Sequence, residues 1–160
     1  MGVDLLILIT LGTQFEPFKR LLDMVENSSI DDEIIVQAGH TKYKSDKMKL
    51  FDFISFDQMN ALITKSDYII THGGTGSILT PLKMGKKVIA CARLKKYREH
   101  VDNHQTEIVS VLREQGYILE VSDTVSLDSL LPQLEGFTPK VYKSNTDFFL
   151  GKLRDCINSE

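Results

Sequence analysis

Short apolar runs alternate along the chain with stretches in which apolar residues recur at helical spacing. The runs predict strands at residues 5–12, 33–39, 51–56, 67–73, 86–92 and 117–121. The intervening stretches predict helices at 18–28, at 57–66, from the glycine-rich turn to Met84, at 103–116 and at 128–134. The first of these helices is the clearest, because Phe18, Leu21, Leu22 and Val25 fall on one face.

Three residues indicate where predicted helices begin, end or bend. Asp57 is expected to cap the helix at 57–66 at its N-terminus. Gly116 stands where a glycine commonly ends a helix, so the helix at 103–116 should stop there. Pro132 is expected to break or kink the helix at 128–134, because proline lacks a backbone N–H group.

Strands that alternate with helices favour βαβ units and a parallel sheet, and near-continuous apolar strands fit burial on both faces. We therefore predict an α/β fold, a Rossmann-like doubly wound parallel sheet, in a single domain spanning residues 1–160. A final helix is expected within about residues 143–160, where Phe149, Leu153 and Ile157 recur every four residues. This apolar stripe has two interpretations: packing on the chain's own core, or docking on a partner.

Composition and charge narrow the function classes. A formal net charge of −3 and a pI of about 5.8 are unlike a general nucleic-acid binder, so nucleic acid is not an expected partner. Cys91 and Cys156 form no CxxC and no Cys/His ligand spacing, so neither a structural metal nor an oxidising compartment is expected. The run Leu5 to Ile9 is too short for a membrane span and follows no basic segment, so we expect a soluble cytoplasmic chain.

The stretch THGGTGS, residues 71–77, lies where a predicted strand gives way to a predicted helix. A helix N-terminus offers unpaired N–H groups and a partial positive charge, and glycines let a ligand approach the backbone. Thr75 and Ser77 add hydroxyl donors, so this turn can hold a diphosphate without a lysine. The loop GTQF, residues 12–15, follows the first strand and should open at the same edge of the sheet.

Two common nucleotide-binding motifs do not fit this turn. A P-loop needs GxxxxGK[ST], and GGTGSIL has no lysine in that place. A dinucleotide fingerprint needs GxGxxG, and Leu79 stands where the third glycine after Gly74 and Gly76 belongs. By itself, the turn is also compatible with a tight connection that binds nothing.

The segment ACARLKKYREHVDNHQTE, residues 90–107, runs from a strand end through a basic loop into a helix. Asn103, His104 and Gln105 lie at the start of that helix, where amide and imidazole groups suit recognition of sugar hydroxyls. The plainer alternatives are a helix cap for Asn103 and exposed first-turn positions for the other two. The basic residues of the loop would either draw in an anionic donor or form a solvated face: Arg93, Lys95, Lys96 and Arg98.

The stretch from THGGTGS to DNHQ and the opening LILITLGTQFEPFKRL resemble the donor-binding half of GT-B glycosyltransferases of the MurG-like class. The resemblance covers roughly residues 5–121, and HGGTGS and DNHQ, about 30 residues apart, are its most specific part. The chain is most similar to the small catalytic subunits of two-part UDP-sugar transferases. These include the eukaryotic UDP-GlcNAc transferase subunit that acts on dolichol-linked chitobiose, and bacterial PssE- and EpsF-like capsule and exopolysaccharide proteins.

The resemblance implies that a UDP-sugar is the donor substrate, bound without a metal or other cofactor, and the sequence contains no DxD. The donor-binding residues that it implies are Gly12, Thr13, Gly73, Gly74, Thr75, Gly76, Ser77, Thr80, Asn103, His104 and Gln105. At Thr80 the sequence departs from many relatives, which carry a glutamate that holds the ribose hydroxyls, so ribose recognition is left open. His72 and Glu16 are weak candidates for the catalytic base, which a partner could supply instead.

The resemblance further implies that the chain is the donor half of an enzyme. A membrane-associated acceptor-binding subunit would complete a heterodimer at the inner face of the membrane, and the acceptor would be a lipid-linked saccharide. The expected reaction is inverting transfer of a hexosyl unit in capsule or exopolysaccharide biosynthesis. The alternative is a non-catalytic nucleotide-sugar-binding subunit that enhances a partner, whereas UDP-sugar epimerases are disfavoured because they are full two-domain chains.

Overall fold

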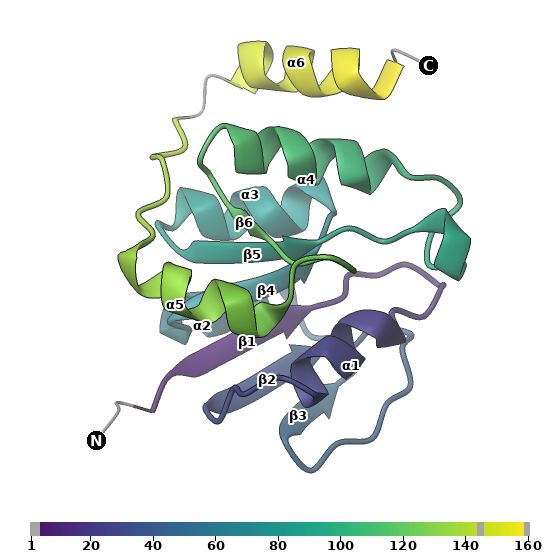
Figure 1. The fold of residues 1–160 in the computed structure, drawn as a ribbon, viewed down its shortest axis with the longest axis vertical. Helices are drawn as coiled ribbons and strands as arrows, with labels where there is room; N and C mark the ends of the chain where they lie inside the picture. The colour runs from purple at the N-terminus through teal and green to yellow at the C-terminus, as the bar shows by residue number, and fades with distance from the viewer. Residues whose placement is uncertain (1–3, 144–145, 159–160) are drawn as a thin grey trace.

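The computed structural model describes residues 4–143 and 146–158, which form a six-stranded parallel sheet with helices on both faces (Figure 1). The strand order is β3-β2-β1-β4-β5-β6. The strands are β1 (Leu6–Thr10), β2 (Glu33–Gln37), β3 (Met48–Phe51), β4 (Tyr68–His72), β5 (Lys87–Cys91) and β6 (Leu119–Glu120). The predicted α/β fold with a doubly wound parallel sheet is confirmed.

The helices divide between the two faces of the sheet. They are α1 (Lys19–Glu26), α2 (Phe56–Lys65), α3 (Thr75–Lys83), α4 (His104–Glu114), α5 (Leu127–Gly136) and α6 (Thr146–Asn158), with a 3-10 turn η1 (Lys95–Tyr97). Ile7 and Ile9 of β1 belong to a hydrophobic cluster with residues of α1 and α5, whereas Leu8 belongs to a second cluster with residues of α2, α3 and α4. Burial on both faces explains why the central strands are continuous apolar runs.

The third predicted strand was placed too far along the chain. The structure ends β3 at Phe51 and begins α2 at Phe56, so the predicted strand at 51–56 is mostly loop. A capping box decides this boundary: the Ser55 side chain accepts from the Gln58 N–H, and the Gln58 side chain accepts from the Ser55 N–H. Ser55, not Asp57, is therefore the N-cap of α2.

The end of the chain packs on the domain's own core. Leu153 of α6 is buried in the second cluster, and Ile157 packs against that cluster, so these two residues follow the core interpretation of the stripe. The side chain of Phe149 lies outside the described part of the structure. The helix α5 runs unbroken through Pro132, which corrects the expected break. Gly116, with φ of +81°, follows α4 as predicted.

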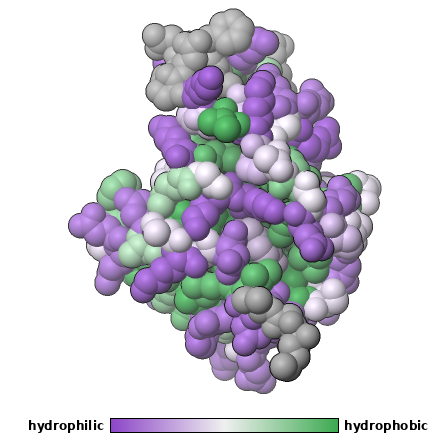
Figure 2. Space-filling view, turned by 90° about the vertical axis from the view of Figure 1, so that its left-hand side faces the viewer, coloured by the Kyte–Doolittle hydropathy of each residue, from purple (hydrophilic) through white to green (hydrophobic). Residues whose placement is uncertain are grey.

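The strand order changes direction between β1 and β4, because the chain leaves β1 for β2 on one side and returns to β4 on the other. A crevice outside the carboxyl ends of two such strands is where doubly wound sheets bind ligands. These ends lie at the right in Figure 1, whereas Figure 2 shows the opposite face, on which hydrophilic residues surround scattered apolar ones. No helix in the described residues is both long and apolar enough to span a membrane.

Candidate functional site

The glycine turn places the N-terminus of α3 at the switch point. The helix begins at Thr75 directly after β4, and its N-cap, Gly74, has no side chain to pair with the first helical N–H groups. The N–H groups of Thr75, Gly76 and Ser77 therefore have no partner within the helix. A Cβ added at Gly76 would meet nothing within 4 Å, so the approach to these amides is open. This arrangement suits an anion.

His72, the last residue of β4, bonds to two residues of the glycine turn, Gly74 and Ser77. Its Nδ1 accepts from the Gly74 N–H at 3.1 Å, and its Nε2 lies 3.1 Å from the Ser77 hydroxyl oxygen. An added Cβ at Gly12 or at Gly74 would collide with the His72 ring. The two glycines are therefore needed because one imidazole fills the space between the loop after β1 and the loop after β4.

The environment of His72 keeps the ring neutral. Burial, with a smaller contribution from the Arg93 charge, lowers the pKa of His72 from 6.5 to about 4. Because Nδ1 accepts a hydrogen bond from a backbone N–H, the proton of the neutral ring belongs on Nε2, which can donate to Ser77. Both ring nitrogens are then engaged within the chain, so the geometry favours a structural role over the role of catalytic base.

Gln105 joins the glycine turn to the segment after β5. Its side chain is buried, and Oε1 accepts from the Gly73 N–H and from the Arg93 N–H, each at 3.0 Å. Its Nε2 lies 3.4 Å from His72 Nδ1. The interpretation of Gln105 as an exposed first-turn residue is wrong, because its oxygen already satisfies two backbone amides. A direct contact between Gln105 and a sugar stays a prediction.

Two of the four basic residues in the loop after β5 are engaged within the chain: Arg93 and Lys96. The Arg93 side chain is only 1% exposed, and its guanidinium donates to the carbonyl oxygens of Leu11, Glu16 and Glu99 at 2.7, 2.7 and 3.0 Å. It therefore braces the loop after β1 against the loop after β5 and cannot draw in a ligand from solvent. Lys96 Nζ lies 2.9 Å from a carboxylate oxygen of Asp123.

Glu99 organises the same loop with its carboxylate. Arg20 of α1 donates to both of its oxygens, at 2.9 and 2.8 Å, in the fork geometry that guanidinium and carboxylate groups favour. One of these oxygens also accepts from the Leu94 N–H at 2.9 Å. Together Glu99 and Arg93 fix the path of the chain from β5 to α4.

Asp102 bonds to the first N–H group of α4, while the side chain of Asn103, the N-cap residue, holds the preceding loop. An Asp102 carboxylate oxygen accepts from the His104 N–H at 3.0 Å, and this bond is the main reason why the pKa of Asp102 is lowered. The same carboxylate lies 3.0 Å from His100 Nδ1 and 3.3 Å from His104 Nδ1. Asn103 occupies the N-cap position of α4, but its side-chain oxygen accepts from the Lys95 N–H at 3.0 Å and not from an N–H group of the helix.

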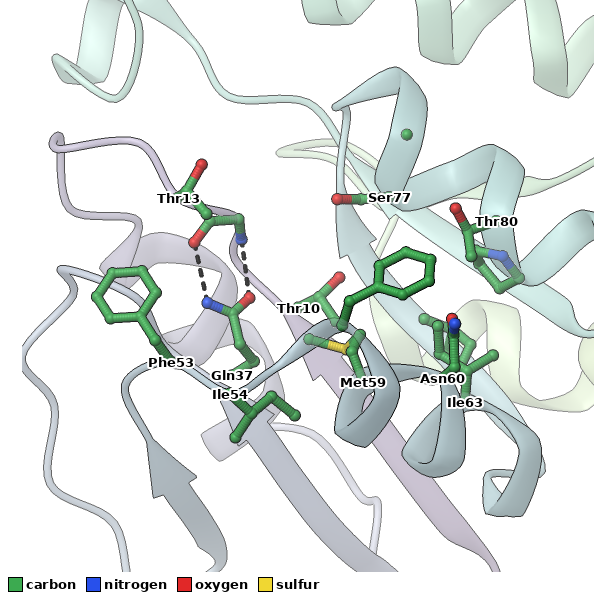
Figure 3. Close-up of a pocket in the computed structure, with 15 residues that line it drawn as sticks. Thr10, Thr13, Gln37, Phe53, Ile54, Met59, Asn60, Ile63, Ser77 and Thr80 are labelled. Atoms are coloured by element: carbon green, nitrogen blue, oxygen red, sulfur yellow. Dashed lines mark hydrogen bonds between the residues drawn. The ribbon is translucent and has the colours of Figure 1, made fainter.

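A pocket of about 240 Å³ opens between the loop after β1 and the helices α2 and α3 (Figure 3). Five of the predicted donor-binding residues line it: Gly12, Thr13, Gly76, Ser77 and Thr80. The rest of its lining is formed by Thr10, Gln37, Phe53, Ile54, Phe56, Met59, Asn60, Ile63, Ile69 and Pro81. Most of these are apolar, so the pocket joins the open amides at the start of α3 to an apolar wall.

Gln37, at the end of β2, fixes the rim of this pocket. Its side-chain oxygen accepts from the Gly12 N–H at 3.2 Å, and its side-chain nitrogen donates to the Gly12 carbonyl at 3.0 Å (Figure 3). The nitrogen also donates to the Asp52 carbonyl at 3.2 Å. One buried amide thus positions the loop after β1 and the loop after β3 together.

A profile of the family described as "Glycosyltransferase family 28 C-terminal domain" matches residues 6–157. The chain belongs to the glycosyltransferase family 28 C-terminal domains. The match covers every strand of the sheet and both turns at the switch point, so the family assignment rests on the fold and the site together.

Two curated relatives of this family 28 domain are named "UDP-N-acetylglucosamine transferase subunit ALG13". The one from Saccharomyces cerevisiae is 35% identical over 79 residues, which cover 49% of this chain and 37% of the relative. The one from Yarrowia lipolytica is 30% identical over 138 residues, which cover 77% of this chain and 68% of the relative. The chain thus spans little more than a third of the first relative and about two thirds of the second.

Solved structures show the same fold. The solution structure of ALG13 matches 94% of this chain and 95% of that chain with a TM-score of 0.62, at 21% identity. CalG4, the calicheamicin glycosyltransferase, matches 96% of this chain but 39% of its own, with a TM-score of 0.55 at 16% identity. The family 28 domain therefore has the fold of one part of a GT-B glycosyltransferase.

The other predicted site residues of the family 28 domain do not line the pocket. Gly73 and Gly74 do not line the pocket, and their N–H groups bond to Gln105 and His72. Thr75, Asn103, His104, Gln105 and Glu16 are not among the lining residues of this pocket. Within residues 4–143 and 146–158, no group of three or more His, Cys, Asp or Glu is arranged to hold a metal ion. Donor binding without a metal stays a prediction.

Sequence reasoning missed the apolar wall. Phe53, Ile54 and Phe56 fall in the predicted strand at 51–56, and Met59 and Asn60 fall in the predicted helix at 57–66. The signal that was available is the spacing of Phe56, Met59, Asn60 and Ile63, which places four side chains on one face of α2. That spacing does not show which neighbour the face meets.

Proposed function

We propose that this chain is the donor-binding subunit of a two-part glycosyltransferase that transfers a hexosyl unit from a UDP-sugar to a lipid-linked acceptor. The observation that carries the proposal is the continuity between the open amides of Gly76 and Ser77 and the apolar wall of the pocket. A nucleoside diphosphate has the matching order of groups, with an anionic diphosphate at one end and a flat base at the other. The amides would hold the diphosphate, and Phe53, Ile54 and Met59 would pack against the base.

In the proposed reaction, negative charge develops on the diphosphate of the leaving UDP. The acceptor hydroxyl oxygen attacks the anomeric carbon, the bond from that carbon to the diphosphate oxygen breaks, and UDP leaves with the electron pair. The N–H groups at the start of α3 stabilise the charge on the leaving group without a metal ion. Attack from the side opposite to UDP inverts the anomeric centre.

The proposed reaction needs a base to take the proton of the acceptor hydroxyl. His72 is poorly suited, because both of its nitrogens are engaged inside the chain. The backbone of Glu16 is bound by Arg93, and this residue does not line the pocket. We therefore assign the base to the partner subunit.

A partner subunit is supported by the relatives and by the surface beside the pocket. The curated relatives are named as subunits. Phe15 and Phe53 are 80% and 50% exposed, and their rings lie 5.1 Å on either side of the His40 ring at the edge that carries the site. This cluster gives an acceptor-binding, membrane-associated partner an apolar surface to cover, which would place the chain at the cytoplasmic face of a membrane.

The names of the relatives make N-acetylglucosamine the first sugar to test, and capsule or exopolysaccharide synthesis is the context that we propose. The chain would be titrated with a panel of UDP-sugars by calorimetry, with magnesium and with a chelator. We expect one UDP-sugar to bind, equally well in both buffers.

The matched variant for this titration is Gly76→Asp. Its Cβ meets nothing in the chain, so folding should be retained, while its carboxylate would occupy the diphosphate position and abolish binding. Absence of binding to every UDP-sugar and to UDP itself would overturn the proposal. Binding without turnover in the presence of the co-expressed partner would instead favour a non-catalytic donor-binding subunit.

A further inference from the structure

A second pocket lies at the opposite edge of the sheet from the glycine turn. It has a volume of about 720 Å³ and is lined where β1, β4 and β5 begin and where α5 ends. This edge faces the viewer in Figure 2. Tyr68, the first residue of β4, lines the pocket, whereas His72, at the other end of the strand, borders the glycine turn about 13 Å away. We call this space the amino-edge pocket.

Carboxylates outnumber cations around the amino-edge pocket. The acidic residues that line it are Asp31, Asp32, Asp67 and Glu135. Lys87 is the one lysine or arginine among its lining residues in the described chain. The Lys87 ammonium donates to two carbonyl oxygens at the end of α5, at 2.7 and 3.3 Å, so its charge is engaged there. The excess of negative charge favours a cationic ligand.

Two of these carboxylates are held in place by the start of β1. One oxygen of Asp32 accepts from the Leu5 N–H at 3.2 Å, and one oxygen of Asp67 accepts from the Leu6 N–H at 2.7 Å. The other oxygen of each carboxylate makes no hydrogen bond within residues 4–143 and 146–158. Each side chain is therefore fixed by the backbone while one of its acceptors is left for a ligand.

A buried hydroxyl gives an independent indication of a ligand. Tyr68 is only 3% exposed, and its ring packs in the first hydrophobic cluster. Its hydroxyl makes no hydrogen bond in the described part of the chain, which is unusual for a buried polar group. Burial and the nearby charges of Asp32 and Asp67 raise the pKa of Tyr68, so the hydroxyl keeps its proton and lies near both carboxylates.

The lining also indicates what kind of cation fits. Within the described residues, no group of three or more His, Cys, Asp or Glu side chains is arranged to hold a metal ion. Apolar side chains from three segments form much of the remaining wall: Leu5, Ile30, Leu131 and Leu134. A chain of methylene groups would pack against this wall and leave its charged ends at the carboxylates.

We propose that the amino-edge pocket binds an alkyl polyamine, a chain of methylene groups that carries two or more ammonium groups. One ammonium group would lie between Asp32 and Asp67 and donate a hydrogen bond to the Tyr68 hydroxyl oxygen. A second would meet the carboxylates of the rim. The pocket volume falls within the range of about 300–1,000 Å³ that is typical of small-molecule sites. This proposal does not depend on the binding of a UDP-sugar at the other edge of the sheet.

The test titrates the full chain with hexane-1,6-diamine by calorimetry, at low salt and about pH 7, where both amino groups are charged. We expect the diamine to bind, and hexane-1,6-diol, which has the same chain without the charges, to give no binding heat. Tyr68→Phe keeps the ring and removes only the hydroxyl, so affinity for the diamine should fall about tenfold. Asp67→Asn keeps an acceptor for the Leu6 N–H and should weaken binding at least as much.

Asp57→Asn is the matched control, because it removes the same charge from the start of α2, outside the amino-edge pocket. It should bind the diamine as tightly as the wild type does. Thermal unfolding checks the fold of each variant, and the nearly isosteric Tyr68→Phe provides the test by itself if Asp67→Asn is unstable. The proposal is overturned if the wild type binds no diamine or binds the diol equally well. It is also overturned if the folded pocket variants lose no more affinity than Asp57→Asn, because the attraction is then a general effect of charge.

Discussion

The two ends of the candidate site are built in opposite ways. At the glycine turn, the polar side chains of His72, Gln105 and Arg93 are buried and bonded within the chain. At the pocket wall, the polar groups of Asn60 and Thr80 have no hydrogen-bond partner in the described residues, and Phe53 and Phe56 are exposed. Folding pairs the polar side chains of the first end and leaves only backbone amides open there, whereas at the second end the side chains themselves are left open.

A residue of the site can therefore be important for either of two reasons. A motif residue such as Gln105 can be essential because it shapes the backbone, although its side chain does not line the pocket. A residue outside every motif, such as Asn60, can line the pocket directly. Substitutions of the buried side chains at the turn should therefore change stability first, and substitutions at the wall should change binding alone.

The largest effect is expected from Arg93→Met. The substitution leaves the buried carbonyl oxygens of Leu11, Glu16 and Glu99 without their donor, and each unsatisfied group costs about 1–3 kcal/mol. Because removal of a buried cation partly offsets this cost, we expect the free energy of unfolding in urea to fall by about 3 kcal/mol. Lys95→Met, on the exposed part of the same loop, should change it by less than about 0.5 kcal/mol. Equal effects of the two substitutions would show that Arg93 does not hold the loop after β1 and the loop after β5 together.

A comparable effect should appear on acidification, through His72. Its pKa is 6.5 when unfolded and about 4 when folded, so between these values the unfolded chain binds more protons than the folded chain. The free energy of unfolding should therefore fall as the pH decreases through this window, by about 3 kcal/mol in all, and be independent of His72 above it.

The control for this pH dependence is His72→Asn, which keeps an acceptor for the Gly74 N–H but does not titrate. Urea unfolding of both proteins at about pH 7.5 and pH 5 measures the difference, since the other histidines are common to both. A wild type that loses no more stability than the variant on acidification would contradict the neutral, buried state of His72.

The smallest effects, and the sharpest comparison, are expected from two alanine substitutions in one turn. In Gly74→Ala the new Cβ collides with the His72 ring, so the free energy of unfolding should fall by about 2 kcal/mol. In Gly76→Ala the Cβ meets nothing, and alanine favours the helix, so stability should be unchanged or raised by up to about 1 kcal/mol. UDP binding should nevertheless weaken at least about tenfold in Gly76→Ala, because the methyl group lies at the anion-binding amides. If the two variants have the same stability, the turn is not held by His72.

The fold could be predicted from the sequence where burial alone determines the pattern. The runs that include Ile7 to Ile9 and Ile69 to Ile70 are apolar because both faces of these strands are covered. The segment FDFISF was misread because its alternation of apolar and polar residues continues through a strand end, a loop and a helix start. Only the short-range pairing of Ser55 with Gln58 marks the boundary.

The candidate site could be predicted only in its local part. The amides after Gly74 follow from a glycine turn at a strand-to-helix junction, which the sequence displays directly. The burial of Arg93 could not be predicted, because its partners Leu11 and Glu16 lie about 80 residues away in the chain. The apolar wall of the pocket could not be predicted from the sequence either, because it depends on how α2 is placed relative to α3.

The ring of His72 also constrains how this part of the sequence can evolve. Because the same imidazole occupies the space beside Gly12 and Gly74, a larger residue at either position requires a smaller one at position 72. A smaller residue at 72 removes the acceptor that holds the Gly74 N–H and the group that meets Ser77. We therefore expect a larger residue at position 12 or at position 74 only together with a smaller residue at position 72.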